Sequence, residues 1–129
     1  MTKQNQVYKC EICGNITEVL HTGVGELVCC GQPMNLQEEK RQEEGNEKHL
    51  PYVVKNENGN LVIRIGETEH PMEEKHYIEW IEINMKDGGR IAKKYFKAGD
   101  KPEVEFHIRG EHFEIRAYCN VHGLWKLEI

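Results

Sequence analysis

The stretch YVVKNENGNLVIRI, residues 52–65, predicts two antiparallel β-strands joined by a tight turn. Residues 52–55 and 61–65 are rich in valine and isoleucine, whose branched side chains favour strands. Between them, Asn58-Gly59 supplies the positive φ angles that a two-residue hairpin turn requires. The segment therefore indicates two neighbouring strands that run in opposite directions.

Strand and turn signals continue to the end of the chain at a spacing of roughly 8–12 residues, which is typical of an antiparallel sandwich or barrel. Val104, Phe106 and Ile108 alternate with polar side chains, which predicts a strand with one buried face. The alternation over residues 76–85 is less regular and does not assign a buried face there. The further strands are predicted over residues 76–85, 90–96, 103–108, 113–119 and 124–128. The expected fold class is mainly β, with seven strands after residue 50.

The N-terminal residues 1–36 offer few large apolar side chains, so a module of this size needs covalent cross-links or a bound metal to stabilise its fold. Cys10 and Cys13 form a CxxC knuckle, in which both sulfurs can reach one ion. Cys29 and Cys30 are adjacent, and neighbouring side chains point apart along an extended chain, so they can share an ion only where the backbone bends. We predict a four-cysteine metal site and leave zinc and iron open. Two disulfides or two inert thiol pairs are the alternative interpretation, and a purely structural zinc ribbon stays open within the metal-binding one.

The composition limits the classes of partner and the cellular location. A formal net charge of -5 argues against nucleic acid or an anionic membrane as the main partner. The sequence shows no signal-peptide core after Met1 and no apolar run near the ~20 residues of a membrane span. An odd number of cysteines, five, fits reduced thiolates better than a disulfide framework. We therefore expect a cytoplasmic protein.

A second group of potential ligands lies after residue 46, at the expected ends of strands and in loops. Such positions can converge at one end of a sandwich. Imidazoles with one thiolate suit iron, copper, zinc or nickel rather than magnesium or calcium. Five candidates favour an ion that keeps one position open for a substrate, which indicates redox chemistry. The five are His49, His70, His76, Cys119 and His122. Three histidines without partners at motif spacing are interpreted as surface or structural residues: His21, His107 and His112.

A charged segment, QEEKRQEEGN at residues 37–46, divides the chain. It has mixed charges and almost no apolar content, so we interpret it as a solvated linker. The predicted domains are residues 1–36, the linker 37–46, and residues 47–129. By spacing alone, Glu47 and Lys48 belong to the solvated end of this linker.

Taken together, the motifs resemble desulfoferrodoxin, the two-iron form of superoxide reductase. The resemblance covers nearly the whole chain, without a departure at an expected ligand position. The motifs that resemble desulforedoxin are YKCEICG (8–14) and VCCG (28–31), and those that resemble the catalytic domain are EKH (47–49), HPMEEKH (70–76) and CNVHGLW (119–125).

The resemblance implies a small desulforedoxin-like or rubredoxin-like metal module followed by an immunoglobulin-like, seven-stranded antiparallel β-sandwich. It implies two iron ions per chain and a homodimer. The first iron would be held by Cys10, Cys13, Cys29 and Cys30, and the second by His49, His70, His76 and His122 around it with Cys119 as axial ligand. The implied function is the one-electron reduction of superoxide to hydrogen peroxide, with the electron supplied by an external donor such as rubredoxin.

The resemblance also gives roles to two residues that spacing alone leaves in the linker. We expect Lys48 to attract the superoxide anion and to position a proton-donating water, since an ammonium on a flexible stem can do so without being a ligand. Glu47 would close onto the open position in the ferric resting state. Two other functions are weighed against this one: a non-catalytic iron electron-transfer protein, and a zinc-ribbon binding module fused to a sandwich.

Overall fold

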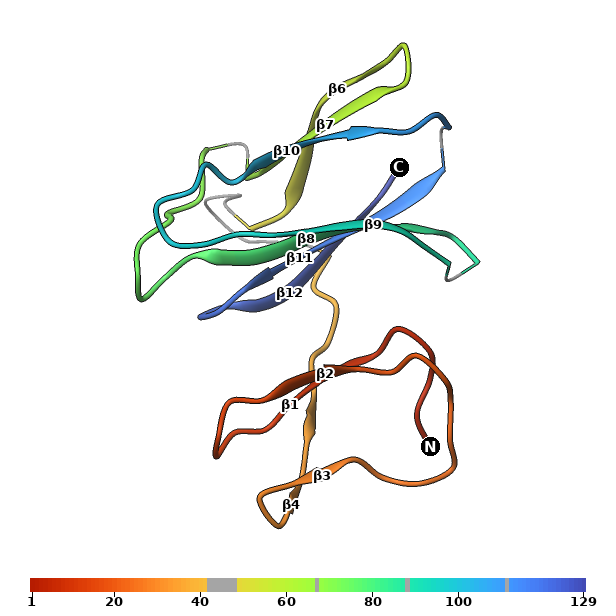
Figure 1. Ribbon diagram of the computed structural model, residues 1–129, viewed down its shortest axis with the longest axis vertical. Coiled ribbons are helices and arrows are strands. Elements are labelled where there is room, and N and C mark those ends of the chain that lie inside the picture. Colours follow the sequence, from red (N-terminus) through yellow and green to blue (C-terminus); the bar gives the residue numbers. More distant parts are fainter. Residues whose placement is uncertain (42–48, 67, 88, 111) are drawn as a thin grey trace. The chain divides into compact units, whose positions relative to one another are not determined.

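The computed structural model describes residues 1–41, 49–66, 68–87, 89–110 and 112–129. It forms two compact units, Met1–Glu38 and Glu39–Ile129. The described secondary structure consists of β-strands paired in antiparallel sheets (Figure 1), so the mainly-β prediction is confirmed. Among the described residues we find no helix that could span a lipid bilayer.

The second unit consists of two antiparallel sheets that face each other as layers (Figure 1). One has the strand order β10-β7-β6 and the other the order β12-β11-β8-β9. All seven predicted strands occur among the described residues, with ends shifted by at most a few positions. They are β6 (Pro51–Glu57), β7 (Asn60–Ile65), β8 (Ile78–Met85), β9 (Arg90–Tyr95), β10 (Glu103–His107), β11 (Phe113–Cys119) and β12 (Gly123–Glu128).

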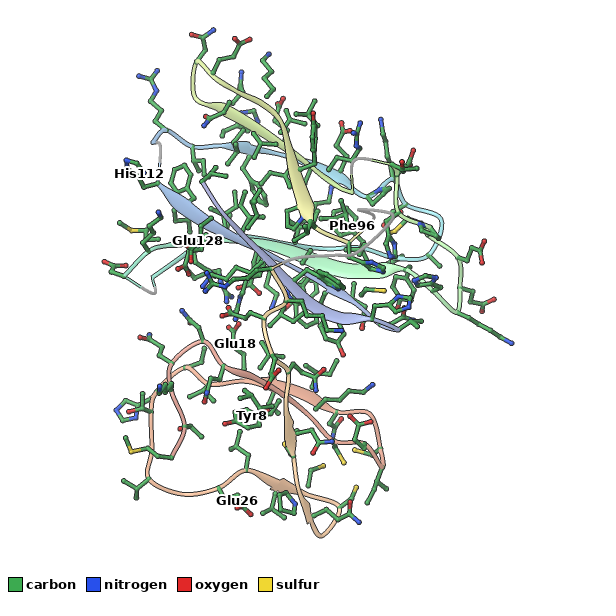
Figure 2. The ribbon with its side chains drawn as sticks, turned by 180° about the vertical axis from the view of Figure 1, so that it is seen from behind. Tyr8, Glu18, Glu26, Phe96, His112 and Glu128 are labelled. Carbon is green, nitrogen blue, oxygen red and sulfur yellow. The ribbon has the colours of Figure 1, made fainter. Side chains whose placement is uncertain are left out.

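The hydrophobic core of this unit lies between its two sheets, where side chains from both layers fill the space (Figure 2). In β10, Val104 and Phe106 are buried and Glu105 is exposed, as the alternation predicted. The hairpin turn between β6 and β7 is also confirmed, because Asn58 and Gly59 have φ angles of 54° and 78°. The core is formed by Leu61, Ile63, Ile65, Ile78, Ile81, Ile83, Phe96, Val104, Phe106, Phe113, Ile115, Ala117 and Cys119.

A register shift in the four-stranded sheet explains why the alternation in β8 is irregular. Tyr118 of β11 pairs with Trp80, but the next residue, Cys119, pairs with Ile78, so one residue of β8 is extra. Ile78 and Ile81 consequently both belong to the core although three positions separate them. Cys119 follows Ile115 and Ala117 at every second position of β11, so it lies on the same core face at the end of that strand and is fully buried.

The first unit is built from very short strands. Its buried apolar side chains are Val7, Cys10 and Val19, so this 38-residue unit has a very small core, as the sequence predicted. One sheet has the order β2-β1-β5, and a separate hairpin pairs β3 with β4. The strands are β1 (Val7–Lys9), β2 (Ile16–Glu18), β3 (Val28–Cys29), β4 (Gln32–Pro33) and β5 (Asn35–Leu36).

The structure differs from the predicted solvated linker at residues 39–41, which we name the strap. The carboxylate of Glu39 lies 3.3 Å from Arg116 and 3.5 Å from Lys126, and Arg41 lies 3.0 Å from Glu128. Composition alone shows the charges of this segment but not the opposite charges, about 80 positions later in the chain, that neutralise them. The remaining linker residues, 42–46, lie outside the described ranges.

Candidate metal centres

The four cysteines of the first unit lie close enough to bind one ion. Their sulfur atoms are all within 4.8 Å of one another, with 3.5 Å between those of Cys13 and Cys29 and 3.9 Å between those of Cys29 and Cys30. A tetrahedron with metal–sulfur bonds of about 2.3 Å has edges of about 3.8 Å, so the spacing fits a bound metal. All five cysteines of the chain are free, which argues against the disulfide alternative.

Left-handed backbone residues bring these cysteines together. Cys30 has a φ of 53° and Gly31 a φ of 75°, at the turn between β3 and β4. This confirms the predicted bend, because it turns the two neighbouring side chains toward a common point. In the first knuckle Gly14 has a φ of 85°, and its N–H donates to the carbonyl of Cys10 at 2.9 Å.

The thiols of this cluster differ strongly in acidity. Backbone N–H groups of Cys13 and Ile12 lower the pKa of Cys10 to about 6. The neighbouring thiols of Cys13, Cys29 and Cys10 raise the pKa of Cys30 to about 12. A thiolate at Cys30 is therefore unfavourable at neutral pH unless a cation compensates its charge, which is what a metal with four sulfur ligands provides.

Because the two units are separately compact, we expect Cys13→Ser to remove the metal of the first unit and to leave that of the second. Losing one of four thiolate ligands weakens a site that has little core to support it. Metal content per chain and hydrogen exchange of the Val7 and Val19 amides measure the outcome. Full metal occupancy together with unchanged exchange protection would contradict a stabilising role for this metal.

The second group of ligands converges at one end of the sandwich. The ligand atoms of His49, His70, His76 and Cys119 all lie within 4.8 Å of one another. His122 adds two contacts, since its Nδ1 lies 2.9 Å from His49 Nε2 and 3.9 Å from Cys119 Sγ. Two ligand atoms at a right angle, each with a metal bond of about 2.1 Å, are about 3.0 Å apart. His49 and His122 thus have the spacing of neighbouring ligands of one ion.

The four imidazole rings form a closed quadrilateral. Going round it, the centroid distances are 4.8 Å from His49 to His70, 4.8 Å to His76, 5.1 Å to His122 and 4.5 Å back to His49. The diagonal from His49 to His76 is longer, 6.3 Å. Four nitrogen ligands around one ion, with Cys119 as a fifth, fit this arrangement.

His70 is in the protonation state of a metal ligand. Its Nδ1 lies 2.7 Å from the carbonyl of Pro71, which can only accept, so Nδ1 carries the proton. The buried Nε2 then has a lone pair and, within the described part of the chain, no hydrogen-bond partner. Burial lowers the pKa of this imidazole to about 4, so it is neutral at physiological pH. An unsatisfied buried acceptor costs about 1–3 kcal/mol, and a bound metal removes that cost.

Cys119 is a buried thiol whose acidity is set by two opposing effects. Burial raises its pKa, and the backbone N–H groups of His122 and Val121 partly offset this by hydrogen bonding to the sulfur. A cation bound at the imidazoles would displace the thiol proton. The two N–H groups would then limit the electron density that the thiolate donates.

Asn120 is a functional residue that the sequence did not reveal. Its Oδ1 accepts from the N–H of Tyr77 at 3.0 Å, its Nδ2 donates to the carbonyl of Lys75 at 3.2 Å, and its own N–H donates to the carbonyl of Tyr77 at 3.2 Å. These bonds tie the segment that carries His76 to the turn that carries Cys119. Only the position of Asn120 inside a ligand motif hints at this role.

The remaining sequence candidates belong to neither group among the described residues. Glu47 and Lys48 are outside the described residues. His107 contacts the side chain of Asn60 at 3.0 Å, and among the described residues neither ligand group includes it. His21 and His112 also belong to neither ligand group among the described residues.

Known proteins resemble this chain along its whole length. Residues 2–37 match the family described as Desulfoferrodoxin, N-terminal domain, and residues 41–128 match Desulfoferrodoxin. A desulfoferrodoxin homolog from Archaeoglobus fulgidus is 52% identical over 126 residues, 98% of each chain. A superoxide reductase from Pyrococcus abyssi is 33% identical over 103 residues, which cover 64% of this chain and 86% of that protein. The solved superoxide reductase from Treponema pallidum supports the fold, with a TM-score of 0.74 at 21% identity over 95% of this chain and 96% of its own.

Proposed function

Because this chain belongs to the desulfoferrodoxin family, we propose that it is a superoxide reductase, an oxidoreductase that converts superoxide to hydrogen peroxide. The family has two iron sites, and the chain has a four-cysteine group and a histidine-cysteine group that fit them. The observation that carries the proposal is the convergence of three imidazoles and one buried thiol at one end of the sandwich, with a fourth imidazole, His122, 2.9 Å from His49.

We assign the first iron to Cys10, Cys13, Cys29 and Cys30, and the second to His49, His70, His76, His122 and Cys119. When bound, the second iron would supply the single electron that, with two protons, turns superoxide into hydrogen peroxide. The surrounding side chains and backbone hold the ligand rings in fixed orientations. The indole of Trp125 stacks on the ring of His49 at 4.8 Å, with 14° between the planes, and so fixes that ring. The hydrogen bond from His70 to Pro71 fixes a second ring.

Lys48 and Glu47 complete the proposed site. They directly precede the proposed ligand His49 in the sequence. An ammonium at this position would attract the superoxide anion and hold a proton-donating water. The Glu47 carboxylate is proposed to close onto the open position in the ferric resting state.

Lys48→Met should slow the capture of superoxide most at low ionic strength, because attraction between an exposed ammonium and an anion is screened by salt. We expect a decrease of roughly tenfold in the second-order rate constant, which diminishes as salt is added. Lys48→Arg keeps the charge and should retain most of the rate. Stopped-flow mixing over a salt series measures it, and a Lys48→Met rate equal to wild type at every salt concentration would exclude this role.

The proposed activity is tested by mixing the reduced, iron-loaded protein rapidly with superoxide. We expect hydrogen peroxide to form in a one-to-one ratio with oxidised protein and without evolution of dioxygen. Dioxygen release would indicate dismutation instead. If the protein does not react, the alternative of a non-catalytic electron carrier is favoured. If it is colourless and contains zinc, the alternative of a structural zinc module is favoured.

We further propose a rubredoxin-like protein as electron donor, a homodimer and a cytoplasmic location. A one-electron donor is required because each turnover consumes one electron. Several large apolar side chains of the first unit are exposed, as expected where a second copy packs: Ile12, Leu20, Val24, Val28 and Leu36. Five free cysteines fit a reducing compartment.

A further inference from the structure

Lys40, in the middle of the strap, is fixed against the turn that carries two of the proposed ligands. Its Nζ donates to the carbonyl of His122 at 2.7 Å and lies 5.2 Å from the centroid of the Trp125 ring. Its main chain also pairs with β12, where its N–H donates to Leu124 at 2.9 Å and its carbonyl accepts from Lys126 at 2.8 Å. A lysine in a solvated linker would have none of these contacts.

These contacts connect Lys40 with both sides of the second centre. On one side it holds the carbonyl of His122, whose ring is a proposed ligand. On the other it covers Trp125, which stacks on the ring of His49. The turn itself requires a glycine, because Gly123 has a φ of 86°.

We propose that Lys40 is a positioning residue of the second metal centre, which fixes the His122 turn and places a positive charge beside the backbone of this proposed ligand. This inference rests on the proposed function, because it takes His122 and Cys119 as ligands of a redox-active iron. A fixed cation favours the state of the iron that carries one more electron, so Lys40 raises the reduction potential. The ammonium is partly solvated, so the effect is moderate.

The two cations of the strap have different partners. Lys40 contacts the ligand turn, through the carbonyl of His122. Arg41, the next residue of the strap, pairs with Glu128 instead.

The test is the midpoint potential of the second iron in the full, iron-loaded protein, for wild type, Lys40→Met, Lys40→Arg and Arg41→Met. We expect Lys40→Met to lower the equilibrium constant for one-electron reduction up to about tenfold, equivalent to about 59 mV. Lys40→Arg keeps the charge and should stay near wild type. Arg41→Met removes the same charge from the same strap, away from the ligands, and should not shift the potential.

Equal potentials for Lys40→Met and wild type would overturn the inference, and so would equal shifts for Lys40→Met and Arg41→Met, which would indicate a general charge effect. The superoxide rate of the wild-type protein separates this failure from failure of the proposed function. If wild type reduces superoxide and Lys40→Met has an unchanged potential, the function stands and the role of Lys40 is wrong. If wild type does not react, the function itself is wrong, and a potential shift in Lys40→Met would still establish the electrostatic coupling.

Discussion

Replacing Cys119 with serine should lower the rate of superoxide reduction by more than about 100-fold. Losing a residue that only hydrogen-bonds to a ligand already costs 10–100-fold in affinity or activity, and Cys119 is itself a proposed ligand. It is also the single thiol in the second group, so serine removes the soft, electron-donating ligand and leaves a weak oxygen donor among the imidazoles. The side chain is fully buried, and the other four cysteines of the chain belong to the first group, so no second thiol of this group can take its place.

Absorption spectra and metal content separate loss of chemistry from loss of iron in this variant. We expect the visible band of the second iron–thiolate centre to disappear while the spectrum of the four-cysteine centre persists. Cys13→Ser is the matched control, since it makes the same chemical change in the other unit and should leave the superoxide rate of the second centre intact. A Cys119→Ser protein that binds iron and retains a rate near wild type would show that the thiolate is not required.

The parts of this molecule that are encoded locally could be predicted from the sequence. The turn at Asn58-Gly59 depends on the φ preferences of two adjacent residues, and the alternation in β10 depends on a pattern of period two. The four-cysteine cluster belongs to the same class. Its two pairs are each made by neighbouring residues, and the bend at Cys30 followed from the need to aim both sulfurs at one ion.

The second centre was harder to predict because its geometry depends on contacts between distant segments. Residue types and strand ends gave five candidate ligands, but only the resemblance to a family assigned them to one iron with an axial thiolate. The bulged pairing of β8 with Cys119, the bonds from Asn120 to residues 75–77 and the docking of the strap all join segments that are far apart in the sequence. No periodicity within a single segment carries that information.

A buried carboxylate in the four-stranded sheet is another feature that only the structure reveals. Glu82 of β8 is fully buried and accepts hydrogen bonds from four neighbouring side chains. Its Oε1 accepts from Trp80 Nε1 at 2.8 Å, and its Oε2 accepts from Asn84 at 2.9 Å, Arg90 at 2.6 Å and Arg116 at 2.8 Å. Since Arg116 is almost as deeply buried, the two charges depend on each other.

Arg116→Met should therefore destabilise the second unit by about 3–5 kcal/mol at neutral pH, because it leaves the Glu82 carboxylate buried without its closest buried counter-charge. Urea unfolding followed by tryptophan fluorescence measures this, since Trp80 and Trp125 are the two tryptophans of the chain and both lie in the second unit. The control is Lys101→Met, which removes an exposed partner of Glu103 at 3.7 Å. It should cost less than about 1 kcal/mol.

The loss in Arg116→Met should depend on pH in a defined direction. Burial raises the pKa of Glu82, but Arg116 and the other donors outweigh it and hold that pKa below its ordinary value. A carboxyl group with a depressed pKa stabilises the fold above the ordinary pKa, and this contribution is lost as the pH falls through the folded value. Wild type should thus lose stability in acid. In Arg116→Met the destabilisation should become smaller in acid, because Glu82 can bind a proton and lose its unpaired charge. The difference between the two proteins should narrow as the pH is lowered, and a difference that is constant from neutral to acidic pH would show that Arg116 stabilises the sheet by packing rather than by its charge.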